Sequence, residues 1–127
     1  MKKQTLHTEK APAAIGPYVQ GWKVGEMIYT SGQLGIDMEK GGLAEDVAAQ
    51  ARASMKNIGE ILACGGAGYG DIVKTTIFLK DLADFKAVNQ VYAEYFEGDY
   101  PARSCVQVAA LPLGGLVEIE CVAVLQK

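Results

Sequence analysis

The stretch VEIECVAVL, residues 117–125, carries the clearest structural pattern in the sequence. Side chains two positions apart in a β-strand point to the same face, so this segment has two distinct faces. One face is entirely apolar and is expected to pack against helices: Val117, Ile119, Cys121, Ala123 and Leu125. The other face combines two carboxylates with two valines: Glu118, Glu120, Val122 and Val124. Such a mixture is unusual for a solvated surface, so we expect a subunit contact there, with the carboxylates near a cleft.

Two segments upstream have the spacing of amphipathic helices. Apolar residues recur every three or four positions over residues 46–64 and again over residues 84–96. Asp46 is a suitable N-cap for the first helix, and Gly65-Gly66 supply the left-handed residue that commonly follows a helix. The predicted stripes are Val47, Ala51, Met55, Ile58 and Leu62 in the first helix, and Phe85, Val88, Val91, Tyr92 and Tyr95 in the second.

Further strands are predicted around these helices. Residues 18–24 and 27–34 suit a hairpin divided at Gly25-Glu26, and residues 72–79 and 104–110 suit single strands. In the 72–79 strand we expect Val73, Thr75, Ile77 and Leu79 to share one face. The order β-β-α-β-α-β-β predicts one α+β domain over residues 1–127, a sandwich with one mixed sheet and two helices on one face.

Composition excludes several classes of function. The 127 residues carry a formal charge of −3 and a pI near 5.1, so no positive field attracts nucleic acid. Three cysteines without a CxxC spacing argue against a disulfide framework or a zinc site. His7 is the single histidine, which disfavours catalytic triads and multi-histidine metal sites. Without a secretory signal or membrane-spanning apolar run, we expect a cytoplasmic protein that uses no metal and contacts no membrane.

Arg103 and two glutamates are the residues most suited to chemistry. In YPARSCV, residues 100–106, Arg103 stands at the mouth of a strand, where it can clamp a carboxylate through two parallel hydrogen bonds. Glu118 and Glu120 share a face, so at least one can orient or deprotonate water in a cavity beside Arg103. The plainer alternatives are a surface arginine and a solvated acidic pair. Cys105 is either a nucleophile or, without a nearby histidine, a small core residue.

Glycines mark other special positions. Gly32 follows Ser31 inside a predicted strand, which indicates a bulge or a close approach of the backbone to another group. Gly41-Gly42 and residues 65–68 are also glycine-rich. Neither segment has the lysine and spacing of a phosphate-binding loop, so we interpret both as turns.

Four segments, taken together, resemble the RidA/YjgF family: APAAIGPY at 11–18, TSGQ at 30–33, PARSCV at 101–106 and VEIE at 117–120. The resemblance spans nearly the whole chain. It implies a homotrimer of chorismate-mutase-like subunits, with active sites in clefts between neighbouring subunits. It also implies cofactor-independent hydrolysis of reactive 2-imino and enamine acids, released by serine and threonine dehydratases, to 2-oxo acids and ammonia.

The same resemblance implies roles for individual residues. Arg103 would clamp the substrate carboxylate, and Glu118 would hold and activate the attacking water. Backbone groups of Cys105 and Gly32 would contact the imine end and the carboxylate, respectively. The other residues expected in the cleft are Tyr18, Ser31 and Asn89. One departure is Gly35, in Leu34-Gly35-Ile36, where many relatives have proline; we expect added mobility at the cleft rim.

Two other functions remain open at this point. The same trimer could hold a small carboxylate without turning it over, as a binding or regulatory module. RNA cleavage or translation inhibition has been attributed to some relatives of this family, but the acidic balance of the chain weighs against it.

Overall fold

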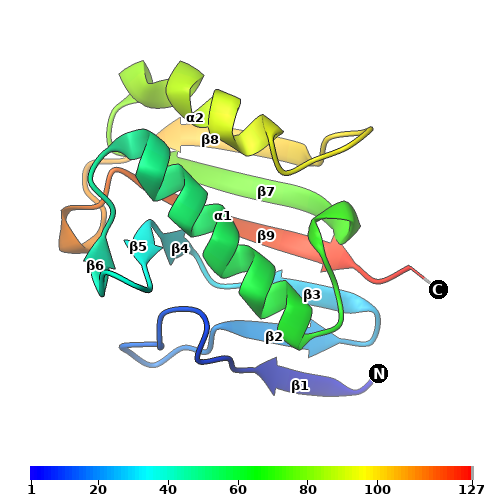
Figure 1. Cartoon of the computed structure of the whole chain (residues 1–127). Helices are drawn as coiled ribbons and strands as arrows, with labels where there is room; N and C mark the ends of the chain where they lie inside the picture. Colours follow the sequence, from blue (N-terminus) through cyan, green and yellow to red (C-terminus); the bar gives the residue numbers. More distant parts are fainter. Residues whose placement is uncertain (127) are drawn as a thin grey trace.

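The computed structural model describes residues 1–126 and shows one twisted sheet with two helices across one of its faces (Figure 1). The seven-stranded sheet has the order β1-β2-β3-β9-β7-β8, and β4 also pairs with β9. Only the β7–β8 pair is parallel among the described strands, so the predicted mixed α+β sheet is confirmed. The strands are β1 (Lys3–Leu6), β2 (Gly21–Val24), β3 (Met27–Thr30), β4 (Gln33–Leu34), β7 (Ile72–Leu79), β8 (Ala102–Gln107) and β9 (Val117–Val124). A small second sheet pairs β5 (Ile36–Asp37) with β6 (Gly42–Leu43).

Helix α1 (Val47–Cys64) follows its prediction closely. The Asp46 carboxylate accepts a hydrogen bond from the Ala49 backbone N–H at 2.8 Å, which confirms it as the N-cap. Gly66 adopts the left-handed conformation after the helix, with φ of 86°. Four residues of the predicted stripe are fully buried against the sheet, and Val47 is half-buried: Ala51, Met55, Ile58 and Leu62.

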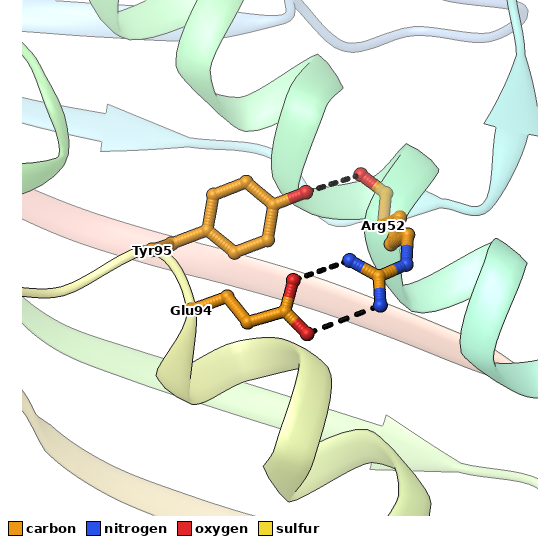
Figure 2. A network of polar contacts seen from close by, with 3 residues as sticks. All are labelled: Arg52, Glu94 and Tyr95. Atoms are coloured by element: carbon orange, nitrogen blue, oxygen red, sulfur yellow. Dashed lines mark hydrogen bonds and ion pairs between the residues drawn. The ribbon is translucent and has the colours of Figure 1, made fainter.

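Helix α2 (Phe85–Ala93) is shorter than the predicted 84–96. Asp84 belongs to a preceding 3₁₀ turn, Leu82–Asp84, and the chain after Ala93 continues in turns with hydrogen bonds three residues back. Tyr95 therefore lies beyond the helix. Its hydroxyl donates to the Arg52 carbonyl at 3.4 Å, while Arg52 pairs with both carboxylate oxygens of Glu94 (Figure 2). This exposed network joins α1 to the end of α2.

The strand predictions needed several corrections. β1 lies in a polar segment without an apolar pattern, and pairing with β2 is what makes it a strand. The predicted 18–24 strand begins only at Gly21, and 27–34 divides into β3 and β4 around Ser31-Gly32. β8 lies earlier than the predicted 104–110. Two further short helical turns, Tyr69–Asp71 and Pro112–Gly114, precede β7 and β9.

A bulge in β7 reverses one prediction about its faces. The register shifts between Ile72 and Lys74, so the strand alternates regularly only from Lys74 onward. Ile72 is buried at 6% exposure, whereas Val73 is 47% exposed and leaves the face predicted for it. Thr75, Ile77 and Leu79 are buried beneath the helices, as expected.

The two faces of β9 differ as the sequence predicts. Its apolar residues up to Ala123 are buried against the helices, while Leu125 is half-buried just beyond the strand end. Glu118, Glu120, Val122 and Val124 are half-buried on the face that no helix covers. No helix of residues 1–126 is both long enough and apolar enough to cross a membrane.

Candidate functional site

Arg103 points to the helix-covered side of the sheet. It lies on β8, the last strand of the sheet order, opposite Thr75 of β7. Thr75 is fully buried under the helices, and residues paired across strands share a face. The guanidinium of Arg103 accordingly meets α2: its Nη1 donates to the Asn89 side-chain oxygen at 2.7 Å.

Two aromatic rings lie near the same guanidinium. Its carbon lies 5.2 Å from the centre of the Tyr92 ring and 5.4 Å from that of Phe85, within the range of cation–π attraction. The Tyr92 hydroxyl is 2.7 Å from the Thr75 hydroxyl, which fixes the ring. Burial raises the pKa of Tyr92, so its hydroxyl is protonated and its ring is uncharged near neutral pH.

The Arg103 side chain lines a hollow of about 400 Å³ together with Asn89, Tyr92, Ala93, Tyr100 and Pro101. A guanidinium has five N–H donors, and Asn89 accepts from one of them. The rings restrict its orientation, so the other donors can present a two-point contact to a carboxylate. We refer to this place as the arginine hollow.

Glu118 lies close to Gly32, on the opposite face of the sheet. A Cβ atom on Gly32 would lie 2.8 Å from the Glu118 carboxyl carbon and 3.0 Å from its Oε1. The prediction that the backbone approaches another group at Gly32 is confirmed, and that group is the Glu118 side chain. Burial raises the pKa of Glu118, and the neighbouring Glu120 carboxylate raises it further. A carboxylate with a raised pKa is a better proton acceptor than an ordinary glutamate.

Four of the predicted site residues meet in a second hollow of about 750 Å³: Tyr18, Ser31, Gly32 and Glu118. We call it the glutamate hollow; Glu120 also lines it. The Ser31 hydroxyl donates to the Val19 carbonyl at 2.6 Å, so its proton is already engaged in holding the loop. Tyr18 is 48% exposed, and its hydroxyl accepts from the Ile15 backbone N–H at 3.4 Å.

The predicted cavity containing both Arg103 and a glutamate does not form within one chain. Arg103 pairs with Thr75, on the helix side, whereas Glu118 pairs with Phe78, an odd number of residues further along β7. An odd separation along a strand places the two side chains on opposite faces. One copy of the chain therefore presents two partial sites, the arginine hollow and the glutamate hollow, separated by the sheet.

Cys105 lines neither hollow. It pairs with Ile77 on the helix side of β8 and is half-buried against the core. Burial raises the pKa of its thiol, an effect that nearby Arg103 partly opposes. The thiol is thus mostly protonated near neutral pH, which favours the interpretation of Cys105 as a core residue over that of a nucleophile.

The structure gives a reason for glycine at position 35 that differs from the expected mobility, namely close packing. A Cβ atom there would lie 2.3 Å from the Gln50 Cβ and 2.5 Å from the Gln50 carbonyl oxygen. The Gly35 carbonyl also accepts from the Ala44 N–H at 3.0 Å. Glycine is needed because the rim of the glutamate hollow packs directly on α1.

Sequence reasoning missed the aromatic residues around Arg103 as parts of a site. Phe85 and Tyr92 had been assigned only to the apolar stripe of α2. Phe85, Asn89 and Tyr92 are spaced by four and three residues, which places them on one helical face. This spacing is the signal from which the two aromatic residues could have been predicted as parts of the site. Among residues 1–126, no group of three or more His, Cys, Asp or Glu side chains could hold a metal ion.

Comparison with known proteins gives consistent matches over nearly the whole chain. Residues 8–125 match the family described as endoribonuclease L-PSP. The chain is 53% identical over 126 residues to Reactive Intermediate Deaminase A, chloroplastic, of Arabidopsis thaliana, covering 98% of this chain and 67% of the relative. It is 53% identical over 124 residues to the 2-iminobutanoate/2-iminopropanoate deaminase of Salmonella typhimurium, covering 95% and 97%.

Solved structures show the same fold. The structure of E. coli TdcF with bound serine superposes with a TM-score of 0.93 at 45% identity, covering 97% of this chain and 99% of that one. The E. coli YjgF gene product gives a TM-score of 0.93 at 51% identity, with 97% and 99% coverage.

Proposed function

The chain belongs to the endoribonuclease L-PSP (RidA/YjgF) family, and we propose that it hydrolyses reactive 2-imino acids to 2-oxo acids and ammonia. Relatives about 50% identical over nearly their full length are named as deaminases of imine intermediates, so the chain is an enzyme of this class. The observation that carries the proposal is the pair of partial sites: a cation held for a carboxylate, and a half-buried carboxylate with a raised pKa.

Arg103 binds the substrate carboxylate in this mechanism. The carboxylate is the one charged group common to all 2-imino acids, and a bidentate guanidinium fixes both its position and its plane. Asn89 and the two aromatic rings hold the guanidinium in place before substrate arrives. Preorganisation of this kind lowers the entropy cost of placing the reacting carbon.

Glu118 positions the attacking water. The water oxygen bonds to C2 of the protonated imine, and its proton passes to Glu118, giving a tetrahedral carbinolamine. Glu118 then returns the proton to nitrogen, and the C–N bond breaks with its electron pair. The hydroxyl proton passes to Glu118 as the C=O bond forms, and the departing ammonia takes this proton up, which restores the Glu118 carboxylate. One water is consumed for each 2-oxo acid and ammonia released. In this proposal the backbone of Gly32, which lines the glutamate hollow, supplies a further contact to substrate. The backbone of Cys105, which lines neither hollow of one copy, contacts substrate only in the assembled trimer.

A second copy of the chain completes the site. Because Arg103 and Glu118 lie on opposite faces of one sheet, a single copy cannot apply both to one small substrate. We propose the trimer of chorismate-mutase-like subunits, with the arginine hollow of one copy facing the glutamate hollow of the next. Apolar side chains on the helix-free face support this assembly: Tyr29 and Val106 are 45% and 44% exposed. Val122, paired with Tyr29, and Val124 are half-buried on the same face.

A coupled assay tests the activity. The metal-free protein is added to a serine or threonine dehydratase, and the formation of 2-oxo acid from the released imine is followed. We expect acceleration that is lost in Arg103→Ala and kept in Arg52→Ala, a matched control that removes an exposed arginine outside both hollows. No acceleration with imines from several amino acids would refute the deaminase proposal.

A small-carboxylate-binding module is the second candidate. It is favoured by one observation, that the TdcF relative of the same fold was solved with bound serine. Glu118→Gln separates the two functions, because a binding module has no use for a proton acceptor. Loss of turnover with retained 2-oxo acid binding would support the deaminase, and unchanged turnover would rule out the role given to Glu118.

A further inference from the structure

A leucine beside the glutamate hollow has an unusual backbone conformation. Leu113, in the turn before β9, has φ of 61° and ψ of 13°, and among residues 1–126 it is the only non-glycine residue with positive φ. Leucine rarely adopts this left-handed conformation. Its side chain is also 66% exposed. Leu113 therefore adds little to the core of the chain, although its conformation is costly.

Leu113 belongs to an aliphatic wall of the glutamate hollow. The wall comprises Ile15, Leu34, Ile36, Pro112 and Leu113. Ile15 is 79% exposed, so two large apolar side chains of the wall face solvent. The turn that carries Leu113 is anchored on the wall, because a Cβ on Gly115 would lie 2.9 Å from the Leu34 Cδ2. Its position relative to Leu34 is thus set by packing.

The wall and the two carboxylates line one continuous hollow. Glu118 and Glu120 share it with the aliphatic residues. A protein surface that filled this hollow with apolar side chains would bury two carboxylates that have no ion-pair partner among the described residues, which is costly. The arginine hollow that we propose to face it leaves room for a small molecule. A small substrate that leaves a water beside Glu118 does not incur this cost. The occupant that fits both parts is a small molecule with an apolar arm.

We propose that this wall receives the side chain of the imino acid, and that Leu113 gives the enzyme a preference for larger aliphatic substrates. The inference rests on the proposed function. Three groups radiate from C2 of a 2-imino acid: the carboxylate goes to Arg103, the imine is attacked by the water at Glu118, and the side chain remains. With C2 beside Glu118, that side chain lies in the glutamate hollow. At about 750 Å³ the hollow holds much more than a methyl group.

The expected preference follows from apolar burial. Each methylene removed from water is worth roughly a fourfold gain in transition-state binding. The imine derived from leucine carries three more side-chain carbons than the imine derived from alanine. Full burial would favour it by about 60-fold in kcat/KM, and loss of one wall residue should remove one or two methylene equivalents, roughly 4- to 15-fold.

Leu113→Asn is the informative variant. Asparagine is close to leucine in size and tolerates the left-handed conformation, so the turn should fold while the wall loses its apolar character. Leu82→Asn is the matched control, because Leu82 is 47% exposed and lies outside both hollows. Imines are generated from leucine and from alanine by an L-amino-acid oxidase, and 2-oxo acid formation is corrected for the uncatalysed rate.

We expect the leucine-to-alanine ratio of kcat/KM to fall roughly 4- to 15-fold in Leu113→Asn and to stay unchanged in Leu82→Asn. An unchanged ratio in Leu113→Asn, with activity on the alanine-derived imine retained, would overturn the inference and leave the deaminase proposal intact. A change in sedimentation without a change in the ratio would also overturn it, by showing that the wall is a subunit contact.

Calorimetric titration separates the inference from the proposed function. The probes are 4-methyl-2-oxopentanoate and pyruvate, which carry the same two side chains on a stable 2-oxo acid. If the parent protein hydrolysed no imine, the deaminase proposal would fail. The ratio of the affinities for 4-methyl-2-oxopentanoate and pyruvate would then be the only test of whether the wall binds an aliphatic side chain. A ratio near one in the parent would overturn the inference; a preference for the branched probe that falls in Leu113→Asn would support it.

Discussion

Gly32→Ala should reduce catalysis sharply while leaving stability nearly unchanged. The added methyl carbon would lie 2.8 Å from the Glu118 carboxyl carbon. Carbon atoms in contact are normally about 3.5–4.0 Å apart, so the carboxyl group must retreat by roughly 0.7–1.2 Å. The atoms that must move are the end of a half-buried side chain on the helix-free face, which can rotate away. We therefore expect the free energy of unfolding to change by about 1 kcal/mol or less.

Activity should respond far more strongly, because Glu118 must hold water against C2. Misplacement by about 1 Å costs on the order of 100-fold in rate. The measurements are kcat for imine hydrolysis and a denaturant unfolding curve on the same preparation. Gly42→Ala is the control, since a Cβ at Gly42 meets nothing within 4 Å. Parental kcat in Gly32→Ala would refute the reasoning that the carboxylate position of Glu118 controls the chemical step.

Three other changes have defined outcomes. Glu118→Gln should lower kcat by about 10²- to 10⁴-fold. Because Glu118 acts as a base with a raised pKa, kcat/KM of the parent protein should fall as the pH drops through that pKa, at a higher pH than for an ordinary glutamate. This acidic decrease in kcat/KM should be absent in Glu118→Gln. Ser54→Ala should raise the free energy of unfolding by about 0–1 kcal/mol, because the Ser54 hydroxyl is fully buried without a hydrogen-bond partner in the structure and because alanine favours helix. A loss of more than about 1 kcal/mol in denaturant unfolding would contradict this. Asp46→Ala should lower the free energy of unfolding by about 1 kcal/mol, because the hydrogen bond from the Ala49 N–H is lost. Asp46→Asn keeps an acceptor oxygen and should recover most of this stability. Equal melting temperatures for the parent protein and Asp46→Ala would count against the role of Asp46 as N-cap.

The sequence alone was enough for features that depend on neighbouring residues. The cap at Asp46, the buried stripe of α1 and the two faces of β9 all follow from local periodicity, because helices and strands repeat over a few residues. The sequence also predicted the order of the main elements, which implied a mixed sheet. It showed the family resemblance as well. The lengths of α2 and β8 were less accurate, since helix and strand ends depend on turns and partners outside the element.

Only the tertiary structure decided how distant segments meet. The polar Lys3–Leu6 is a strand because β2 lies beside it, and Gly35 is required because α1 packs against it. The pairing of Arg103 with Thr75 and of Glu118 with Phe78 in the sheet sends these two side chains to opposite faces. Strand register arises from long-range hydrogen bonding, and a shift of one residue reverses every side chain. The residue types of the site were therefore legible in the sequence, whereas its division into two hollows was not.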